Sequence, residues 1–261
     1  MKIALMDSGI GLLPTAAALR QLRPDVDLVL SSDPDGMPWG PRTAEDVTEH
    51  ALACARAAAA HRPDALVVAC NTASVNALEA LRAELEPGLP VIGTVPAIKP
   101  AAAGGGRVAI WATPATTGSP YQLRLIEEFG GAAAEVTGIA CPGLADAVER
   151  GDDAAIDAAV ADAASRTPAG TDTIVLGCTH YELVEERIRA AVGATGTGGP
   201  VCFGSAAAVA AQALRRIGDA TAARGTATLT VLHSGRPSRL SAAAAHYAQG
   251  LALVAPVPAA G

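Results

Sequence analysis

Residues 66–74 read LVVACNTAS, so a run of apolar residues stops at Cys70 and small polar residues follow it. A short and fully apolar run is typical of a strand that is buried on both faces, and Ser74 is a suitable N-cap for a helix after it. The chain repeats this pattern around Cys178, where residues 174–181 read IVLGCTHY. Two strands that each lead into a cysteine and a threonine indicate that two parts of the chain are built alike.

Short apolar runs alternate with longer Ala-rich segments along the rest of the chain. This alternation predicts an α/β protein with mostly parallel, buried sheets. Thr43, with Asp46 one helical turn later, resembles a capping box and is expected to begin a helix. The expected strands are 3–6, 26–30, 65–69, 91–92, 108–111, 174–176 and 228–232, and the expected helices are 14–22, 43–61, 74–84, 119–129, 152–165, 182–192 and 205–217.

The spacing of the polar strand ends predicts two lobes. Asp7 follows the first strand 63 positions before Cys70, and Thr113 follows a later strand 65 positions before Cys178. Ligand sites in open α/β sheets form at the carboxyl ends of the strands. We therefore expect two pseudo-symmetric α/β lobes with the active site in the cleft between them. The first lobe is expected at residues 1–96 with 210–261, and the second at residues 97–209.

The composition of the 261 residues argues against several kinds of function. There are 19 Lys and Arg against 26 Asp and Glu, a formal net charge of −7, which does not suit a nucleic-acid-binding surface. The only lysines are Lys2 and Lys99, and neither lies in a setting suited to a Schiff base with pyridoxal phosphate. The five cysteines form no CxxC pair and no zinc-like cluster. We therefore expect no pyridoxal phosphate and no metal site, whereas the net charge says little about a small-molecule substrate, since one local pocket can oppose the global sign.

The same features predict a cytoplasmic protein. An odd number of cysteines in a chain of this size suits a reducing compartment. The N-terminal apolar run is too short for a signal peptide, and no uninterrupted apolar stretch is long enough to cross a bilayer. Neither a membrane nor a nucleic acid is expected as a partner, and a homodimer is compatible with the sequence.

The two thiols allow three interpretations. Each cysteine alone is most simply a small buried apolar residue, and Cys178 with the nearby His180 also suits the nucleophile of a hydrolase. A pair of thiols at matching positions instead suits an acid and a base on opposite sides of one carbon, as inversion of configuration requires. A free thiol has a pKa of about 8.5, and lowering it by one unit takes about 1.4 kcal/mol of anion stabilisation. A helix end gives only about 0.3–1 kcal/mol, so hydrogen bonds from Asn71, Thr72 and Thr179 would also be needed.

Six motifs follow one another along the chain: MDSGIG (6–11), MPWGPR (37–42), VVACNTAS (67–74), CPGLADAVERG (141–151), VLGCTHY (175–181) and VLHSGRPSRL (231–240). Their order resembles that of the glutamate racemases, which belong to the cofactor-independent aspartate/glutamate racemase superfamily. These motifs extend over nearly the full chain, and the two cysteine motifs together are highly specific. The resemblance implies two α/β lobes around one active site, no cofactor, and interconversion of L- and D-glutamate, which supplies D-glutamate for peptidoglycan.

The resemblance also implies roles for individual residues. Cys70 would deprotonate the D-enantiomer with the help of Asp7, and Cys178 the L-enantiomer with the help of Glu149 and His180. Because no cofactor serves as an electron sink, the site would have to stabilise a developing carbanion by hydrogen bonds in a cleft that excludes water. The ammonium and carboxylate groups of the substrate would be held at Ser8, Trp39, Gly40, Asn71, Thr72, Thr116 and Thr179.

Three departures from the family pattern bear on the substrate rather than on the chemistry. Leu12 stands where the family usually has a glycine, Trp39 replaces a tyrosine, and Glu182 replaces a proline. Trp39 would remove a hydroxyl and add bulk at a pocket wall. The alternatives are therefore a racemase or isomerase of aspartate or of another acidic or non-proteinogenic amino acid, and a relative that binds a ligand without turnover.

The cysteines and histidines outside these roles have simpler interpretations. We expect Cys54, Cys141 and Cys202 to be packing or surface residues, as most cysteines are. We expect His50 and His61 to lie at exposed helix ends.

Overall fold

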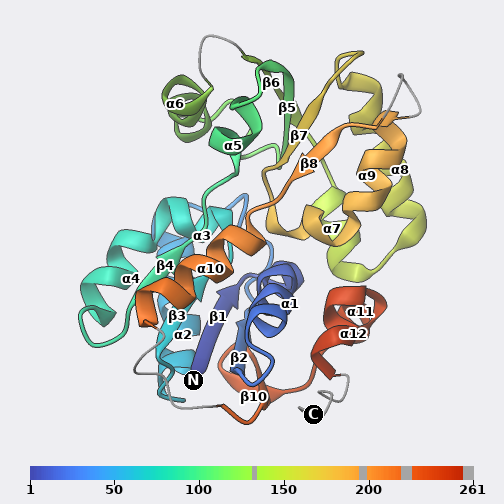
Figure 1. The fold of residues 1–261 in the computed structure, drawn as a ribbon. Coiled ribbons are helices and arrows are strands. Elements are labelled where there is room, and N and C mark those ends of the chain that lie inside the picture. Colours follow the sequence, from blue (N-terminus) through green and yellow to red (C-terminus); the bar gives the residue numbers. More distant parts are fainter. Residues whose placement is uncertain (131–133, 194–198, 219–224, 255–261) are drawn as a thin grey trace. The chain divides into compact units, whose positions relative to one another are not determined.

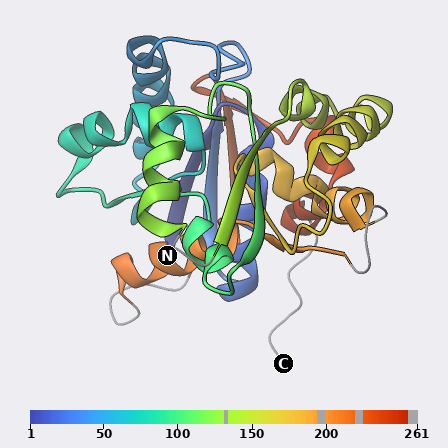
Figure 2. The same ribbon diagram turned by 90° about the horizontal axis from the view of Figure 1, so that it is seen from above.

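The computed structural model describes residues 1–130, 134–193, 199–218 and 225–254. The chain divides into two compact units, unit 1 (Met1–Thr94 with Ala206–Gly261) and unit 2 (Val95–Ser205). Each unit is built on one β-sheet with helices around it (Figures 1 and 2). In the described ranges, no helix is both long and apolar enough to cross a membrane.

The sheet of unit 1 has six strands. They are β1 (Lys2–Asp7), β2 (Asp27–Ser32), β3 (Ala65–Val68), β4 (Val91–Gly93), β9 (Leu229–His233) and β10 (Arg236–Ser238). Their order is β10–β9–β2–β1–β3–β4, and every neighbouring pair is parallel except β9 with β10. The central strands are apolar on both faces because helices cover both sides of the sheet.

The helices of unit 1 confirm one predicted cap and correct another. The Thr43 side chain accepts a hydrogen bond from the backbone of Asp46, as expected. Ser74 is not a cap, because its hydroxyl donates to the Val68 carbonyl from within a helix that begins one turn earlier, with Cys70 as N-cap. The helices are η1 (Ile10–Leu12), α1 (Leu13–Leu22), α2 (Ala44–Ala59), α3 (Asn71–Asn76), α4 (Leu78–Leu85), α10 (Ala206–Ile217), α11 (Ala242–His246) and α12 (Ala248–Val254).

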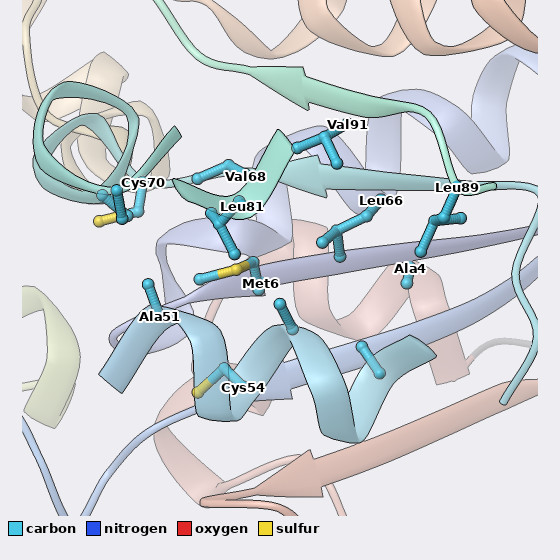
Figure 3. Close-up of a cluster of buried hydrophobic side chains, with 14 of the residues drawn as sticks. Ala4, Met6, Ala51, Cys54, Leu66, Val68, Cys70, Leu81, Leu89 and Val91 are labelled. Carbon is cyan, nitrogen blue, oxygen red and sulfur yellow. The ribbon is translucent and has the colours of Figure 1, made fainter. Parts of the chain in front are cut away.

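A buried cluster between the sheet and α2 forms much of the core of unit 1 (Figure 3). Alternate residues of a strand point to the same face, and Leu66 and Val68 of β3 share this cluster with Met6 of β1. Ala51 and Cys54 of α2 belong to the same cluster. Full burial of one such large apolar side chain contributes about 1.5–3 kcal/mol. Figure 3 shows Cys70 at one end of this cluster, beyond the end of β3.

Unit 2 has a four-stranded sheet in which every pair is parallel. Its strands are β5 (Gly106–Ala112), β6 (Ala134–Ala140), β7 (Thr173–Leu176) and β8 (Val201–Phe203), in the order β6–β5–β7–β8. Ile98 and Ala101 of α5 pack with strand residues Val108, Ile110 and Val175 in its core. The helices are α5 (Ile98–Ala102), α6 (Pro120–Phe129), α7 (Leu144–Arg150), α8 (Asp153–Arg166), η2 (Thr179–Val184) and α9 (Glu185–Gly193).

The two units share a strand order. The first four strands of unit 1 lie as β2–β1–β3–β4, and those of unit 2 as β6–β5–β7–β8. In each unit the first strand therefore lies between the second and the third, and the fourth pairs with the third. One backbone bond is also repeated, because Ala69 N–H donates to the Met6 carbonyl at 2.8 Å and Gly177 N–H to the Trp111 carbonyl at 2.7 Å. The predicted α/β class with mostly parallel sheets is confirmed, and the predicted repeat is confirmed at the level of strand order.

Candidate active site

Cys70 lies where β3 gives way to α3. It is the N-cap residue of that helix, with an extended backbone (φ −138°, ψ 121°), and its carbonyl accepts the first helical bond from Ser74 N–H at 2.9 Å. No side-chain bond caps the helix, and the side chain of Cys70 is buried together with that of Asn71. The thiol at the end of this apolar strand therefore lies beside the backbone N–H groups that begin helix α3.

Asp7 lies at the carboxyl end of the neighbouring strand. Met6 pairs with Val68, and Ala69 N–H donates to the Met6 carbonyl, so the end of β1 runs beside the segment that carries Cys70. Asp7 is 1% exposed. The structure therefore brings the strand ends of Asp7 and Cys70 together within unit 1, as the sequence predicts.

The segment that follows β2 carries Trp39 and Gly40 and is organised by Asp33. Oδ1 of Asp33 accepts from Ser234 Oγ at 2.8 Å and from Gly36 N–H at 3.3 Å. Oδ2 accepts from Trp39 Nε1 at 3.1 Å and lies 2.7 Å from His50 Nδ1. The indole of Trp39 is 1% exposed and belongs to the same buried cluster as Cys70. Its one polar atom is therefore bonded inside unit 1.

The expectation that His50 lies at an exposed helix end is wrong. His50 lies within α2, and its imidazole reaches the carboxylate of Asp33. Sequence reasoning also missed Asp33. The rule that selected Asp7, a polar residue at the carboxyl end of a parallel strand, would have found it, because β2 is the neighbour of β1.

Cys178 of unit 2 has the same local setting as Cys70. It is the N-cap residue of η2, with an extended backbone (φ −134°, ψ 135°), and Tyr181 N–H donates to its carbonyl at 3.0 Å. Gly177 precedes it at a close approach of two strands, where an added Cβ would lie 2.8 Å from the Trp111 carbonyl oxygen. The absence of a side chain at Gly177 thus allows the backbone to lie close to β5 just before Cys178.

Cys178, His180 and Glu149 form a chain of polar side chains. Cys178 Sγ lies 3.9 Å from His180 Nδ1, and His180 Nε2 lies 2.9 Å from Glu149 Oε2. The imidazole is 6% exposed and the carboxylate 21%. A carboxylate that holds one imidazole nitrogen leaves the other to exchange a proton with the thiol. Spacing in the sequence did not establish this contact, because residues two apart at a strand end need not meet.

Hydroxyl groups lie at the other predicted positions of unit 2. Thr113 Oγ1 and Thr116 Oγ1 are 3.2 Å apart in the loop after β5, and Thr179 is buried at the start of η2. In unit 1, the Thr72 carbonyl accepts from Asn76 Nδ2 at 2.8 Å, and the Ser8 carbonyl accepts from Asp33 N–H at 3.1 Å. The hydroxyl groups of these residues are neutral and can offer hydrogen bonds to a charged ligand.

The remaining cysteines are Cys54, Cys141 and Cys202. Burial raises the pKa of Cys54, Cys141 and Cys202 to about 12 in each case, so all three stay protonated at neutral pH. Burial also raises the pKa of Tyr181, whose hydroxyl donates to the Cys141 carbonyl at 3.3 Å. Among the described residues, no group of three or more His, Cys, Asp and Glu side chains could hold a metal ion.

A parallel-sheet unit whose third strand leads into an N-cap cysteine occurs twice in this chain. Residues 13–214 match the family described as Asp/Glu/Hydantoin racemase. The chain belongs to this family. A glutamate racemase of Roseiflexus sp. (strain RS-1) is 40% identical over 199 residues, which cover 73% of this chain and 71% of that protein.

Solved structures of the racemase family have the same fold. The crystal structure of Escherichia coli glutamate racemase in complex with L-glutamate and the activator UDP-MurNAc-Ala aligns with a TM-score of 0.79 at 26% identity, over 94% of this chain and 91% of that one. Glutamate racemase from Aquifex pyrophilus aligns with a TM-score of 0.67 at 29% identity, over 92% of this chain and 98% of that one. The family alignment ends at residue 214, so β9 and β10 lie beyond it.

Proposed function

We propose that this racemase-family chain is a glutamate racemase that uses two thiols and no cofactor. The observation that carries the proposal is that Cys70 and Cys178 occupy the same position in two units of the same strand order, each as the N-cap residue after the third strand. The similarity to glutamate racemases, at 40% identity for the Roseiflexus protein, supports glutamate as the substrate. The two thiols would act as the catalytic acid and base on one substrate carbon.

In the proposed reaction of L-glutamate, the Cys178 thiolate takes the α-proton. The Cα–H bond breaks, an S–H bond forms, and the electron pair stays on Cα and its carboxylate as a planar carbanion. The Cys70 thiol then gives its proton to the opposite face, so that D-glutamate and a Cys70 thiolate result. The D-enantiomer reacts by the reverse path. His180 and Glu149 assist Cys178 as a chain of proton acceptors, and Asp7 assists Cys70.

Neutral groups would hold the substrate and the developing charge. Hydroxyl, amide and backbone N–H donors bind carboxylates without adding a competing base, and they stabilise the carbanion best in a site that excludes water. The proposed binding residues are Ser8, Trp39, Gly40, Asn71 and Thr72 in unit 1, and Thr116 and Thr179 in unit 2. Since the Trp39 indole is buried and bonded to Asp33, its backbone is the part that we expect to meet the substrate.

The proposal extends to the context of the reaction. D-glutamate would be used in peptidoglycan synthesis, and the enzyme would work in the cytoplasm. Two lobes at residues 1–96 with 210–261 and at residues 97–209 would each supply one thiol. A homodimer in solution would be seen by light scattering coupled to size-exclusion chromatography.

Racemisation of glutamate is tested by circular dichroism and by NMR in D2O. The wild-type chain should bring either enantiomer of glutamate to a racemic mixture and place deuterium at Cα. Aspartate serves as the competing substrate, and faster turnover of aspartate than of glutamate would overturn the assignment. Binding of glutamate without exchange at Cα would favour a ligand-binding relative instead.

Two variants test the assignment of the thiols. Cys70→Ser and Cys178→Ser should each abolish racemisation. Cys178→Ser should still exchange the α-proton of D-glutamate, because Cys70 remains, and Cys70→Ser should still exchange that of L-glutamate. Full activity in either variant would refute the two-thiol mechanism.

A further inference from the structure

The end of β2 holds a set of polar groups that the proposed reaction does not use. Asp33 is 5% exposed, and its carboxylate accepts bonds from Trp39 and Ser234 and meets the imidazole of His50. Its backbone N–H donates to the carbonyl of Ser8, one of the proposed binding residues. One buried residue thus connects the end of β1, the segment with Trp39 and Gly40, and helix α2.

Glycine at position 36 makes room for this arrangement. A Cβ there would overlap Oδ2 of Asp33 and would lie 2.5 Å from Nδ1 and Cε1 of His50. The segment is fixed further by Gly36 N–H and Met37 N–H, which both donate to the Asp33 carbonyl at 3.1 Å, and by Arg42 Nε, which donates to the Gly36 carbonyl at 2.8 Å. The imidazole of His50 therefore fills the space in which a side chain of residue 36 would lie.

We infer that Asp33 and His50 are positioning residues for substrate binding, acting through the Trp39–Gly40 segment. This inference rests on the proposed function, in which that segment meets the substrate. A buried carboxylate needs donors on both oxygens, and without His50 the Oδ2 atom of Asp33 keeps only the indole N–H of Trp39 as a described donor. The carboxylate would then turn toward water and draw the indole with it.

The imidazole acts as a hydrogen-bond donor in this arrangement. Its second nitrogen, Nε2, lies 3.4 Å from Oδ1 of Asp46, whose other oxygen pairs with Arg42. His50 thus lies between two carboxylates, and the bond to Asp33 is the shorter and more buried one. A glutamine at this position keeps an N–H donor for Asp33, whereas an alanine removes it.

The kinetic test compares His50→Ala with His50→Gln. Loss of a bond to a buried charge should raise the KM for both D- and L-glutamate about tenfold in His50→Ala, with kcat within about threefold of wild type. His50→Gln should stay within about threefold of wild type in both constants. His61→Ala is the matched control, because His61 lies beyond the end of α2 and donates no bond to Asp33 in the described structure. It should behave as wild type.

A second test measures the burial of Trp39 in the Trp39–Gly40 segment and does not depend on catalytic turnover. The chain has two tryptophans, so Trp111→Phe leaves Trp39 as the only indole. In that background His50→Ala should expose the indole of Trp39, so that acrylamide quenches its fluorescence. In His50→Gln the indole should stay buried and resist quenching. Gly36→Ala should act like His50→Ala, because its Cβ would overlap Oδ2 of Asp33 as well as crowd the imidazole of His50.

These outcomes separate the inference from the proposed function. If the wild-type chain neither racemises glutamate nor exchanges its α-proton, the proposed function fails, and the quenching test still decides whether His50 and Asp33 hold Trp39. Wild-type KM in His50→Ala, or equal losses in His50→Ala and His50→Gln, would overturn the inference. The kinetic variants keep both tryptophans, so this test stands even if Trp111→Phe does not fold.

Discussion

Replacement of Glu149 by glutamine tests the carboxylate–imidazole–thiol chain of unit 2. Glutamine keeps the size of the side chain and can still accept from His180 Nε2, which lies 2.9 Å from Oε2, but it removes the negative charge. A hydrogen bond to a charged group contributes about 1.5–3 kcal/mol and a neutral one about 0.5–1.5 kcal/mol. The difference of about 1–1.5 kcal/mol corresponds to a fall in kcat/KM of about 5- to 13-fold. Because the imidazole is 6% exposed, water should not screen this difference away.

Thermodynamics fixes how this loss is shared between the two directions. Enantiomers have equal free energies, so kcat/KM must fall by the same factor for L- and D-glutamate. Isotope effects reveal which step has slowed. In the proposed mechanism, Cys178 takes the α-proton of L-glutamate and Cys70 that of D-glutamate. The deuterium isotope effect on kcat/KM of Glu149→Gln should therefore rise for α-deuterated L-glutamate and fall for α-deuterated D-glutamate.

The assay is circular dichroism with protiated and deuterated substrates. The matched control is Glu186→Gln, which removes an 81% exposed carboxylate that pairs with Arg189 on the surface of α9, and it should change kcat/KM less than about twofold. Unchanged kcat/KM and unchanged isotope effects in Glu149→Gln would refute the assignment of Glu149 and His180 as partners of Cys178.

Three further predictions concern stability and packing. Burial raises the pKa of Cys54 to about 12 in the folded chain. The contribution of this thiol to the free energy of unfolding is therefore complete below about pH 9 and is lost as the pH rises toward 12. Urea unfolding in reducing buffer should show that this contribution falls by about 1.4 kcal/mol per pH unit, and the fall should be absent in Cys54→Ala. An identical slope in Cys54→Ala would contradict this. Gly177→Ala would place a Cβ 2.8 Å from the Trp111 carbonyl oxygen, so it should lower the free energy of unfolding by about 1–3 kcal/mol. The same clash should displace Cys178 and lower the racemase activity. Wild-type stability and turnover in this variant would contradict the close approach. An added Cβ on Gly40 meets nothing within 4 Å, so Gly40→Ala should unfold within about 0.5 kcal/mol of wild type while the KM for glutamate rises, and an unchanged KM would remove Gly40 from the proposed binding site.

Strand ends were predictable because apolar runs stop abruptly there. The runs before Asp7, Cys70 and Cys178 each lie in a central strand covered on both faces, and such strands contain little besides apolar residues. Three edge strands, β6, β8 and β10, were not predicted. Partial exposure mixes polar residues into β6 and β10, and β8 is only three residues long, so its apolar run is too short to stand out. The exposed Arg236–Ser238 strand even contains a proline, which edge strands tolerate.

Contacts between distant residues were harder to predict than positions along the chain. Asp33 and His50 meet because β2 and α2 pack together, and no periodicity of the sequence encodes that pairing. The buried Trp39 indole likewise depends on Asp33 as a partner. The family resemblance predicted that Cys178, His180 and Glu149 act together. The distances between their side chains depend on the packing of α7 against η2, which the sequence does not show.

The path of the chain through unit 1 has a consequence for its synthesis on the ribosome. Strand β2 is complete at residue 32, yet its outer neighbour β9 begins at residue 229, after the whole of unit 2. Until β9 emerges, the outer edge of β2 has no partner strand, and such an edge can pair with another chain. Unit 2, which is continuous in sequence, can complete its four strands first. The unit that is started first is therefore finished last. A chain whose synthesis ends after residue 205 would expose the outer edge of β2, with its backbone groups unpaired.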